Sequence, residues 1–320
     1  MKQRRSFLVI LLMFPALFGV CLAQPFPNKP IRLITGNSPG TVIDGSARMI
    51  GVELEKSLGQ PVVIEFKTGA NGTIAAQAVK SAPADGYTLY LGSAPQVHPL
   101  LNANNGVDAA KEYTSVSLLV KAPYFLFARS NLPFTSVAEL AAYSKANPQT
   151  LKFGAASQLQ ELVMEVIKNK TGIAISQNIP YRGSPPVVTA MLANDVDLAT
   201  SSAPPFLPHV QTGKLRALLI ASDKRMPDLP QVPTGFEVGM PVELGLYVGL
   251  WAPAGTPAAV VRKLSSAFAA ATKLPAIADQ LRKTFGAEPI GSTPEEQSRF
   301  FESDMKVWSD AAAATNFKPQ

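Results

Sequence analysis

The sequence is poor in the side chains that most catalytic and metal sites use. Its 320 residues include one cysteine, Cys21, and two histidines, His98 and His209. A Ser-His-acid triad would have to use one of these two histidines. No cluster of histidine, aspartate and glutamate has the spacing of metal ligands, and no His-Glu-x-x-His motif is present. The sequence thus argues against an enzyme, and we expect no catalytic residue, no metal ion and no cofactor.

Charged residues are scarce as well. They make up 16% of the chain, below the roughly 25% of a typical soluble domain, whereas hydrophobic residues make up 47%. The 28 prolines and 22 glycines are spread along the chain. These proportions argue against a disordered protein and against a coiled coil. At about one domain for every 150 residues, the length predicts two lobes.

The first 23 residues are typical of a secretory signal peptide. Three basic residues precede an almost wholly apolar run, residues 7–20, which ends shortly before the small residue Ala23. The run is shorter than the roughly 20 residues that a membrane-spanning helix needs, and Pro15 interrupts it. We expect cleavage after Ala23 and a periplasmic protein. The alternative is a lipid anchor on Cys21, which bulky Val20 disfavours.

Cleavage would change the character of the chain. Removing 23 residues from 320 leaves 297, and removing three basic residues from a net charge of +6 leaves +3. No cluster of lysine and arginine with interleaved aromatic residues suggests a nucleic-acid partner. The cysteine also leaves, so the mature protein can form neither an internal disulfide nor a thiol-based site.

Strands alternate with helices along the mature chain. Short apolar and β-branched runs predict strands, and apolar residues three and four apart predict helices. The predicted strands cover residues 31–34, 61–65, 87–92, 124–129, 152–154, 196–199, 217–220 and 246–252. The predicted helices cover 47–58, 73–81, 137–146, 159–170, 187–193, 258–272, 275–285 and 294–314. This order predicts an α/β fold in which helices cover both faces of mostly parallel sheets.

The chain builds one α/β lobe, then a second, and ends in helices that could return to pack on the first. Strands near residues 123–129 and 245–252 would cross between the lobes and form a hinge. We assign residues 24–123 and 249–320 to lobe 1 and residues 124–248 to lobe 2.

Four turns between a strand and a helix are rich in glycine, serine and threonine or alanine. They include Gly36–Thr41, Ser93-Ala94, Ala155–Ser157 and Gly183-Ser184. Each presents free backbone N–H groups at the positive end of a helix. One such turn is ordinary in an α/β protein, but two in each lobe predict a ligand site between the lobes that holds a carboxylate.

Nine short motifs follow one another along nearly the whole mature chain. They are Lys29–Ile34, Pro39-Gly40 with Asp44 and Ala47-Arg48, Leu58–Val63, Gly69–Gly72, Asp85–Leu89, Pro180–Gly183, Gly213–Ala217, Leu229–Thr234 and Ala252–Pro257. Each motif is weak by itself. Together and in this order they resemble the Bug-type periplasmic receptors of tripartite tricarboxylate transporters.

The resemblance implies a fold, a function and a site. The fold is the two-lobe periplasmic-binding-protein fold (α/β, type II, "Venus flytrap") with two crossover hinge strands. The function is to bind a small carboxylate between the lobes and deliver it to membrane permease subunits, and we expect a monomer. By position, the implied ligand-binding residues are Ser38, Gly40, Thr41, Asp44, Ser93, Ala94 and Gln96 of lobe 1 and Ala155, Ser157, Gln158, Tyr181, Gly183, Ser184 and Ser201 of lobe 2.

The chain departs from the family at several of these positions. Family members usually carry glycine where Thr41 stands and aspartate where Ser201 stands, and their loop after Gly154 is longer and often ends in histidine, near the place of Glu161. We interpret this as a retained fold with an altered pocket. For Asp44, contact with a ligand amine or hydroxyl and stabilisation of its own helix start remain alternatives.

Two other functions remain as alternatives to a solute receptor. One is a sensor or partner-binding module derived from the same fold. The other is an extracytoplasmic hydrolase that uses Ser38 or Ser157, which the scarcity of histidine disfavours.

Overall fold

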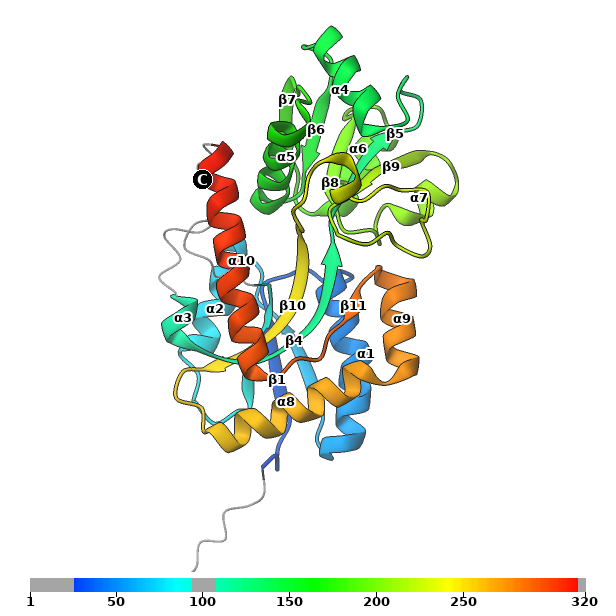
Figure 1. Ribbon diagram of the computed structural model, residues 1–320. Helices are drawn as coiled ribbons and strands as arrows, with labels where there is room; N and C mark the ends of the chain where they lie inside the picture. Colours follow the sequence, from blue (N-terminus) through cyan, green and yellow to red (C-terminus); the bar gives the residue numbers. More distant parts are fainter. Residues whose placement is uncertain (1–25, 94–107, 316–320) are drawn as a thin grey trace, which may run out of the picture.

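The computed structural model describes residues 26–93 and 108–315, which form two lobes (Figure 1). Lobe 1 is built on a six-stranded sheet and lobe 2 on a five-stranded sheet. The expected signal peptide lies outside the described residues, as do Ala94, Gln96 and His98. In the described part of the chain, no helix is long and apolar enough to cross a membrane.

The chain forms most of lobe 1, then lobe 2, and then returns to lobe 1. Lobe 1 begins with β1 (Ile31–Thr35), α1 (Val42–Leu58), β2 (Val62–Phe66), α2 (Thr73–Lys80), β3 (Thr88–Gly92), α3 (Ala109–Glu112) and β4 (Tyr113–Pro123). Lobe 2 contains β5 (Phe125–Arg129), α4 (Val137–Ala146), β6 (Lys152–Ala155), α5 (Gln158–Thr171), β7 (Gln177–Pro180), α6 (Ser184–Leu192), β8 (Leu198–Ser201), α7 (Leu207–Gln211) and β9 (Leu215–Ile220). The chain ends with β10 (Gly245–Pro253), α8 (Ala258–Lys273), α9 (Pro275–Phe285), β11 (Glu288–Pro289) and α10 (Pro294–Thr315).

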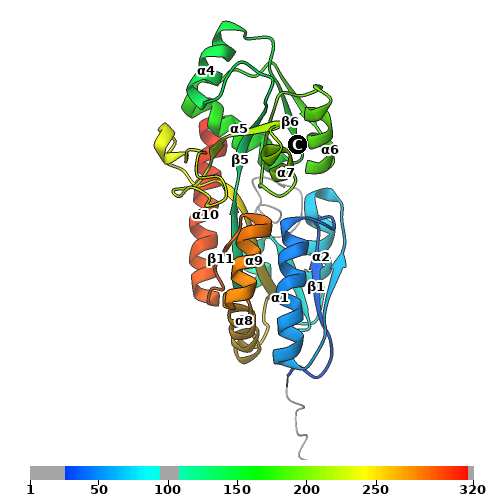
Figure 2. The ribbon, with the colours of Figure 1, turned by 90° about the vertical axis from the view of Figure 1, so that its right-hand side faces the viewer.

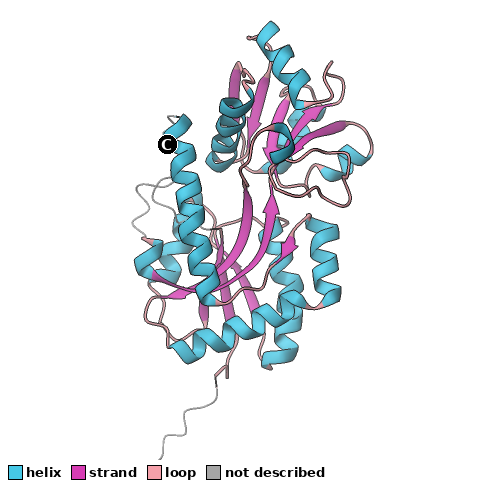
Figure 3. Cartoon of the chain, in the orientation of Figure 1, coloured by secondary structure: helices cyan, strands magenta, loops and turns pink. Residues whose placement is uncertain are grey.

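Helices cover both faces of each sheet, as the sequence predicts (Figures 2 and 3). In lobe 1, α1, α8 and α9 bury one face through residues such as Ile43, Phe268 and Leu281, whereas α2 packs on the other through Ala76. In lobe 2, α4 and α5 cover one face and α6 covers the other. Burial of these apolar faces is the main stabilising contribution to each lobe.

Both sheets are mixed, which corrects the expectation of mostly parallel sheets. The order of lobe 1 is β11-β4-β10-β3-β1-β2, and that of lobe 2 is β7-β6-β8-β5-β9. The strand-helix units do form parallel pairs, since β1 lies parallel to β2 and β3, and β6 lies parallel to β7 and β8. The strands that connect the lobes, and β9 and β11, join antiparallel.

Two strands cross between the lobes side by side, as predicted. β4 continues through Tyr124 into β5, and β10 pairs antiparallel with β4 from Gly245 opposite Pro123 to Pro253 opposite Tyr113. The N–H of Tyr124 donates to the carbonyl of Leu244 at 2.9 Å. The connection is therefore a hydrogen-bonded ribbon.

The last helix, α10, touches both lobes (Figure 1). Phe301 packs among Tyr90 and Trp251 of lobe 1. Two turns later, Trp308 is 1% exposed and belongs to the apolar core of lobe 2. The side-chain amide of Asn169 on α5 donates to the carbonyl of Ala314 at 3.0 Å. α10 thus joins the lobes beside the two crossing strands.

Asp304 lies on α10 between these two anchoring aromatic residues. Burial raises the pKa of its carboxyl to about 6. Three neighbours lower this pKa, but by less than burial raises it. They are the Tyr247 hydroxyl and the Trp308 indole, both acting as hydrogen-bond donors, and the positive charge of Lys121. Tyr247 lies on β10 and Lys121 on β4, so this carboxyl is held against the two strands that connect the lobes.

Replacing Asp304 by asparagine should stabilise the protein above pH 6 and not at pH 4. Because the folded pKa of about 6 lies above the roughly 3.9 of an unfolded aspartate, the folded state binds this proton more tightly, and stability falls as pH rises between the two values. Two pKa units correspond to up to about 3 kcal/mol. Urea unfolding of wild type and Asp304→Asn at pH 4 and pH 7.5 measures the difference.

The matched control is Asp310→Asn, which removes an exposed carboxylate from the same helix. A gain for Asp304→Asn that is equal at both pH values, or one shared by Asp310→Asn, would contradict a buried, protonated carboxyl at the connection.

Candidate functional site

The carboxyl ends of strands from the two lobes face each other. β10 enters lobe 1 from lobe 2 and runs antiparallel to β3, so β3, β1 and β2 point their carboxyl ends towards lobe 2. β5 enters lobe 2 from lobe 1 and runs antiparallel to β8, so β8 and β6 point theirs towards lobe 1. The loops after these strands therefore lie on the two edges that face each other, which is where α/β folds bind ligands.

The loop after β1 holds itself together through Asp44. The Asp44 carboxylate accepts the N–H of Gly40 at 2.8 Å, and its other oxygen lies 2.6 Å from Nε of Arg48. Thr41 caps α1 and accepts the N–H of Asp44 at 3.5 Å, while its hydroxyl donates to the carbonyl of Ser38 at 3.0 Å. Asp44 is 5% exposed. Asp44 was predicted either to contact a ligand or to stabilise the start of its own helix. These contacts are of the second kind, and they also occupy the N–H of Gly40.

A second loop of lobe 1 lies against the first. A Cβ on Gly36 would stand 2.5 Å from Cα of Gly72, so the two backbones are in direct contact. Gly72 has a φ of 88° and is the N-cap of α2. We did not predict this loop as part of the site, although the motif Gly69–Gly72 was recognised. The sequence signal is the position of this glycine turn between the predicted strand 61–65 and the predicted helix 73–81, as in the four turns that were predicted. Ser93, 1% exposed, directly follows β3, the strand on the other side of β1.

In lobe 2, the structure brings together Ser184 and Ser201 through a residue that we did not predict, Gln160. The side-chain oxygen of Gln160 accepts the N–H of Ala156 at 2.9 Å. Its side-chain nitrogen lies 3.4 Å from Oγ of Ser184 and 3.5 Å from Oγ of Ser201, and the two hydroxyls are 3.0 Å apart. The sequence signal for Gln160 is the Ser-x-x-Gln spacing from Ser157, which is that of a capping box.

The other predicted residues of lobe 2 build the loops around this cluster. Ser157 is exposed and caps α5 by accepting the N–H of Gln160 at 3.4 Å, and Gln158 is the first residue of that helix. Tyr181 donates its N–H to the carbonyl of Ala155 at 2.7 Å. Burial, and then the charge of Asp195, raise the pKa of the Tyr181 hydroxyl. Gly183 has a φ of 91° and precedes the first residue of α6.

Glu161, which stands near the place of the family's histidine, is not part of this cluster. It lines a separate hollow with Asn178, Glu165 and Lys168. Burial is the main influence on its carboxyl and raises its pKa, while a hydrogen bond from Asn178 lowers it. Adjacent residues of α5 thus face different surroundings, and Gln160 is the one that reaches the serines.

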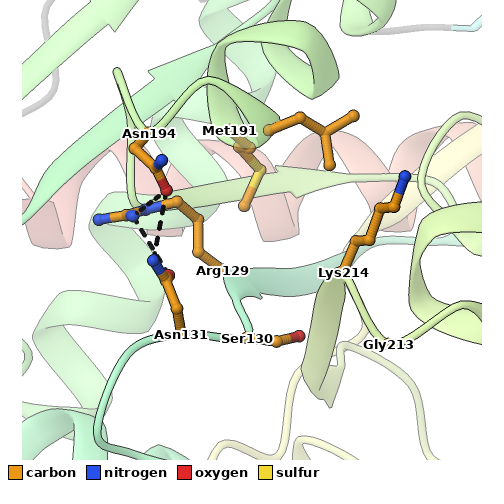
Figure 4. A pocket seen from close by; sticks show the side chains of 8 residues that line it. Arg129, Ser130, Asn131, Met191, Asn194, Gly213 and Lys214 are labelled. Carbon is orange, nitrogen blue, oxygen red and sulfur yellow. Dashed lines mark hydrogen bonds between the residues drawn. The ribbon is translucent and has the colours of Figure 1, made fainter.

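A hollow of about 550 Å³ lies elsewhere on lobe 2 (Figure 4). It is lined by residues at the carboxyl end of β5 and before β9, and so at the end of the sheet away from lobe 1. Two basic side chains, Arg129 and Lys214, line this hollow from opposite sides. The Arg129 guanidinium is hydrogen bonded to Asp197 and to Asn194, and Asp197 also accepts the N–H of Lys152 at 2.8 Å. These contacts tie strands and turns together.

The loop after β1 also reads Gly-Asn-Ser-Pro-Gly over residues 36–40, the Gly-x-Ser-x-Gly spacing of a hydrolase nucleophile. A nucleophilic serine is activated by a general base within hydrogen-bond reach, most often a histidine. His209 lies on α7 of lobe 2, whereas Ser38 lies on lobe 1, and His98 is outside the described residues. In the same described part of the chain, no three histidine, cysteine, aspartate or glutamate side chains gather to hold a metal ion.

Comparison with known proteins agrees with this architecture. BugT of Bordetella pertussis is 32% identical over 302 residues, which cover 92% of each chain. The structure of R. palustris Rpa4515 with adipate has a TM-score of 0.84 at 32% identity and covers 92% of this chain and 100% of that one. MatC (Rpa3494) from Rhodopseudomonas palustris with bound malate has a TM-score of 0.79 at 28% identity and covers 89% and 99%.

The predicted family is confirmed by a match over most of the chain. Residues 46–316 match the sequence family described as "Tripartite tricarboxylate transporter family receptor" (TctC). The motifs that suggested the Bug-type receptors lie mainly within this range. The chain therefore belongs to the family of tripartite tricarboxylate transporter receptors.

Proposed function

We propose that this protein is a periplasmic solute receptor that binds a small organic carboxylate between its lobes and delivers it to the permease subunits of a tripartite tricarboxylate-type transporter. One observation supports this most directly. Helices α1 and α2 of lobe 1 and α5 of lobe 2 begin after strands whose carboxyl ends face the other lobe. Helix N-termini offer unpaired N–H groups and partial positive charge, which favour an anion.

The charges near these loops also suit an anion. The carboxylate of Asp44 is already paired with Arg48 and with its own turn, so it adds little repulsion. In lobe 2, the polar groups of the cluster are the neutral side chains of Gln160, Ser184 and Ser201. Backbone N–H groups, hydroxyls and ordered water would hold the carboxylate, since hydrogen bonds to an ionised acceptor are the strong ones.

The ligand class that we propose is inferred from the ligands in the structures of two related proteins. Rpa4515 carries adipate and MatC carries malate, and both molecules are dicarboxylates. We propose a small carboxylate of this kind for the present chain, which would act as a monomer after cleavage behind Ala23. The residues that would touch it are the loop 36–41, Gly72, Ser93 and the cluster of Ser184 and Ser201.

A titration with carboxylates tests the proposal. The chain without residues 1–23 should bind at least one of adipate, malate and propionate in isothermal titration calorimetry. At a hundred times its Kd, that ligand should stabilise the protein by about 2.7 kcal/mol, seen as a rise in Tm. The control is adipamide, which has the length of adipate but no charge and should bind much more weakly. Failure of all three carboxylates to bind would refute the proposal.

Replacing Ser201 by aspartate should weaken binding of whichever dicarboxylate binds wild type. Ser201 is 1% exposed, so the new carboxylate would carry a poorly solvated negative charge beside the bound anion. We expect a Kd at least tenfold higher, which corresponds to about 1.4 kcal/mol. Ser303→Asp places the same charge on the exposed face of α10 and should leave the Kd unchanged. An unchanged Kd for Ser201→Asp would remove Ser201 from the site.

A further inference from the structure

The direction of the Gln160 side chain is determined by its neighbours. Gln160 is 6% exposed, and the backbone N–H of Ala156 lies 2.9 Å from one atom of its amide. A backbone N–H can only donate, so that atom must be the oxygen. The nitrogen is then the atom that faces Ser184 and Ser201, and it can only donate to their hydroxyls.

The remaining protons of the cluster can be counted. Each serine hydroxyl has one proton, and the 3.0 Å contact between Ser184 and Ser201 uses one of the two. Gln160 offers these hydroxyls only N–H groups, so it cannot accept the other proton. Among the residues that the structure describes, neither hydroxyl makes a further hydrogen bond. One hydroxyl proton is thus left to point away from the cluster.

The position of the two serines determines which one presents that proton. Ser201 is 1% exposed, whereas Ser184 is half-buried and so is the one that a ligand can reach. Ser184 is also the first residue of the nine-residue helix α6, whose N-terminus favours an acceptor in front of it. The donors then follow one direction, from the Gln160 amide to Ser201, from Ser201 to Ser184, and from Ser184 outwards. Hydrogen bonds in such a chain strengthen one another.

We propose that Gln160 is a positioning residue that sets this direction and thereby makes the lobe 2 half of the site select a hydrogen-bond acceptor. The inference rests on the proposed function and specifies it further. A ligand carboxylate receives the hydroxyl proton of Ser184, whereas a ligand ammonium meets a donor there and is rejected. The selectivity needs no charged side chain in the cluster.

Gln160→Glu separates this role from helix capping. A glutamate oxygen can accept the N–H of Ala156 as the glutamine oxygen does. Its carboxylate has no proton to give, so both serine hydroxyls can turn inwards and the outward donor is lost. We expect a Tm near that of wild type and a Kd for adipate at least tenfold higher at pH 8. Burial at this position raises the pKa of the new glutamate, and as the pH is lowered through that pKa the glutamate becomes protonated, donates again, and the ratio to wild type shrinks.

Two comparisons complete the experiment. Gln177→Glu adds the same charge at an exposed position of lobe 2 and should bind adipate like wild type at every pH. Wild type should prefer adipate to 6-aminohexanoate, in which an ammonium replaces one carboxylate, and Gln160→Glu should lose much of that preference.

The outcomes distinguish the inference from the function on which it rests. If wild type binds adipate and Gln160→Glu binds it equally well, the inference is wrong and the receptor function stands. If the loss is the same at every pH and follows a fall in Tm, Gln160 is only a cap and the inference is again wrong. If wild type binds none of adipate, malate and propionate, the proposed function fails, and the inference fails with it.

Discussion

The antiparallel pairing of β4 with β10 is the interaction on which the rest of the molecule depends. β4 leaves lobe 1 as β10 enters it, and the two are hydrogen bonded along their length. Because β10 also pairs with β3, this ribbon fixes the direction of the parallel strands of lobe 1, and β5 fixes it in lobe 2. The carboxyl ends of both sets face each other as a result. The donors at the helix starts therefore come together because of strand direction, without any contact of their own.

α10 adds a constraint to this connection. A two-strand ribbon alone could bend or twist, but Phe301 anchors α10 in lobe 1 and Trp308 anchors it in the core of lobe 2. Any change in the angle between the lobes has to keep Trp308 in that core while α10 or the ribbon bends. The buried carboxyl of Asp304 on α10 lies against both strands of the ribbon, near Tyr247 of β10 and Lys121 of β4. Its desolvation is a local cost, which the apolar packing on either side offsets.

The sequence predicted the elements with a regular pattern and missed those whose identity depends on partners. β1, α5 and all but the first turn of α1 follow from apolar periodicity, whereas the caps Thr41 and Ser157 were found only in the structure. β4 was missed except for its last residue, because serine and threonine interrupt the run of apolar residues that would indicate a strand. It is recognised as a strand only from its pairing with β10 on one side and β11 on the other. β7 was missed because its four residues are mostly exposed. Mixed sheets could not be predicted, since strand direction follows from the return of β10.

The candidate site shows the same division. The loops at Gly36 and Gly183 were predicted, because turn chemistry is written in the local sequence. Gly72 and Gln160 were not predicted. Each lies in a recognisable local pattern, but its contact is with a residue distant in the chain, Gly36 and Ser201 respectively, and the pattern does not specify that contact.

The neutral cluster also gives the low charge of the sequence a physical role. A buried arginine or lysine would attract a carboxylate, but it would have to be desolvated and would need a counterion whenever the site is empty. An amide and two hydroxyls are neutral and hydrogen bonded to one another without ligand, so they need no counterion when the site is empty. In the proposed site, the charge at the cluster would come from the ligand. The proposed selection by proton direction needs geometry rather than charge, and it would explain how a chain with few charged residues can suit an anion.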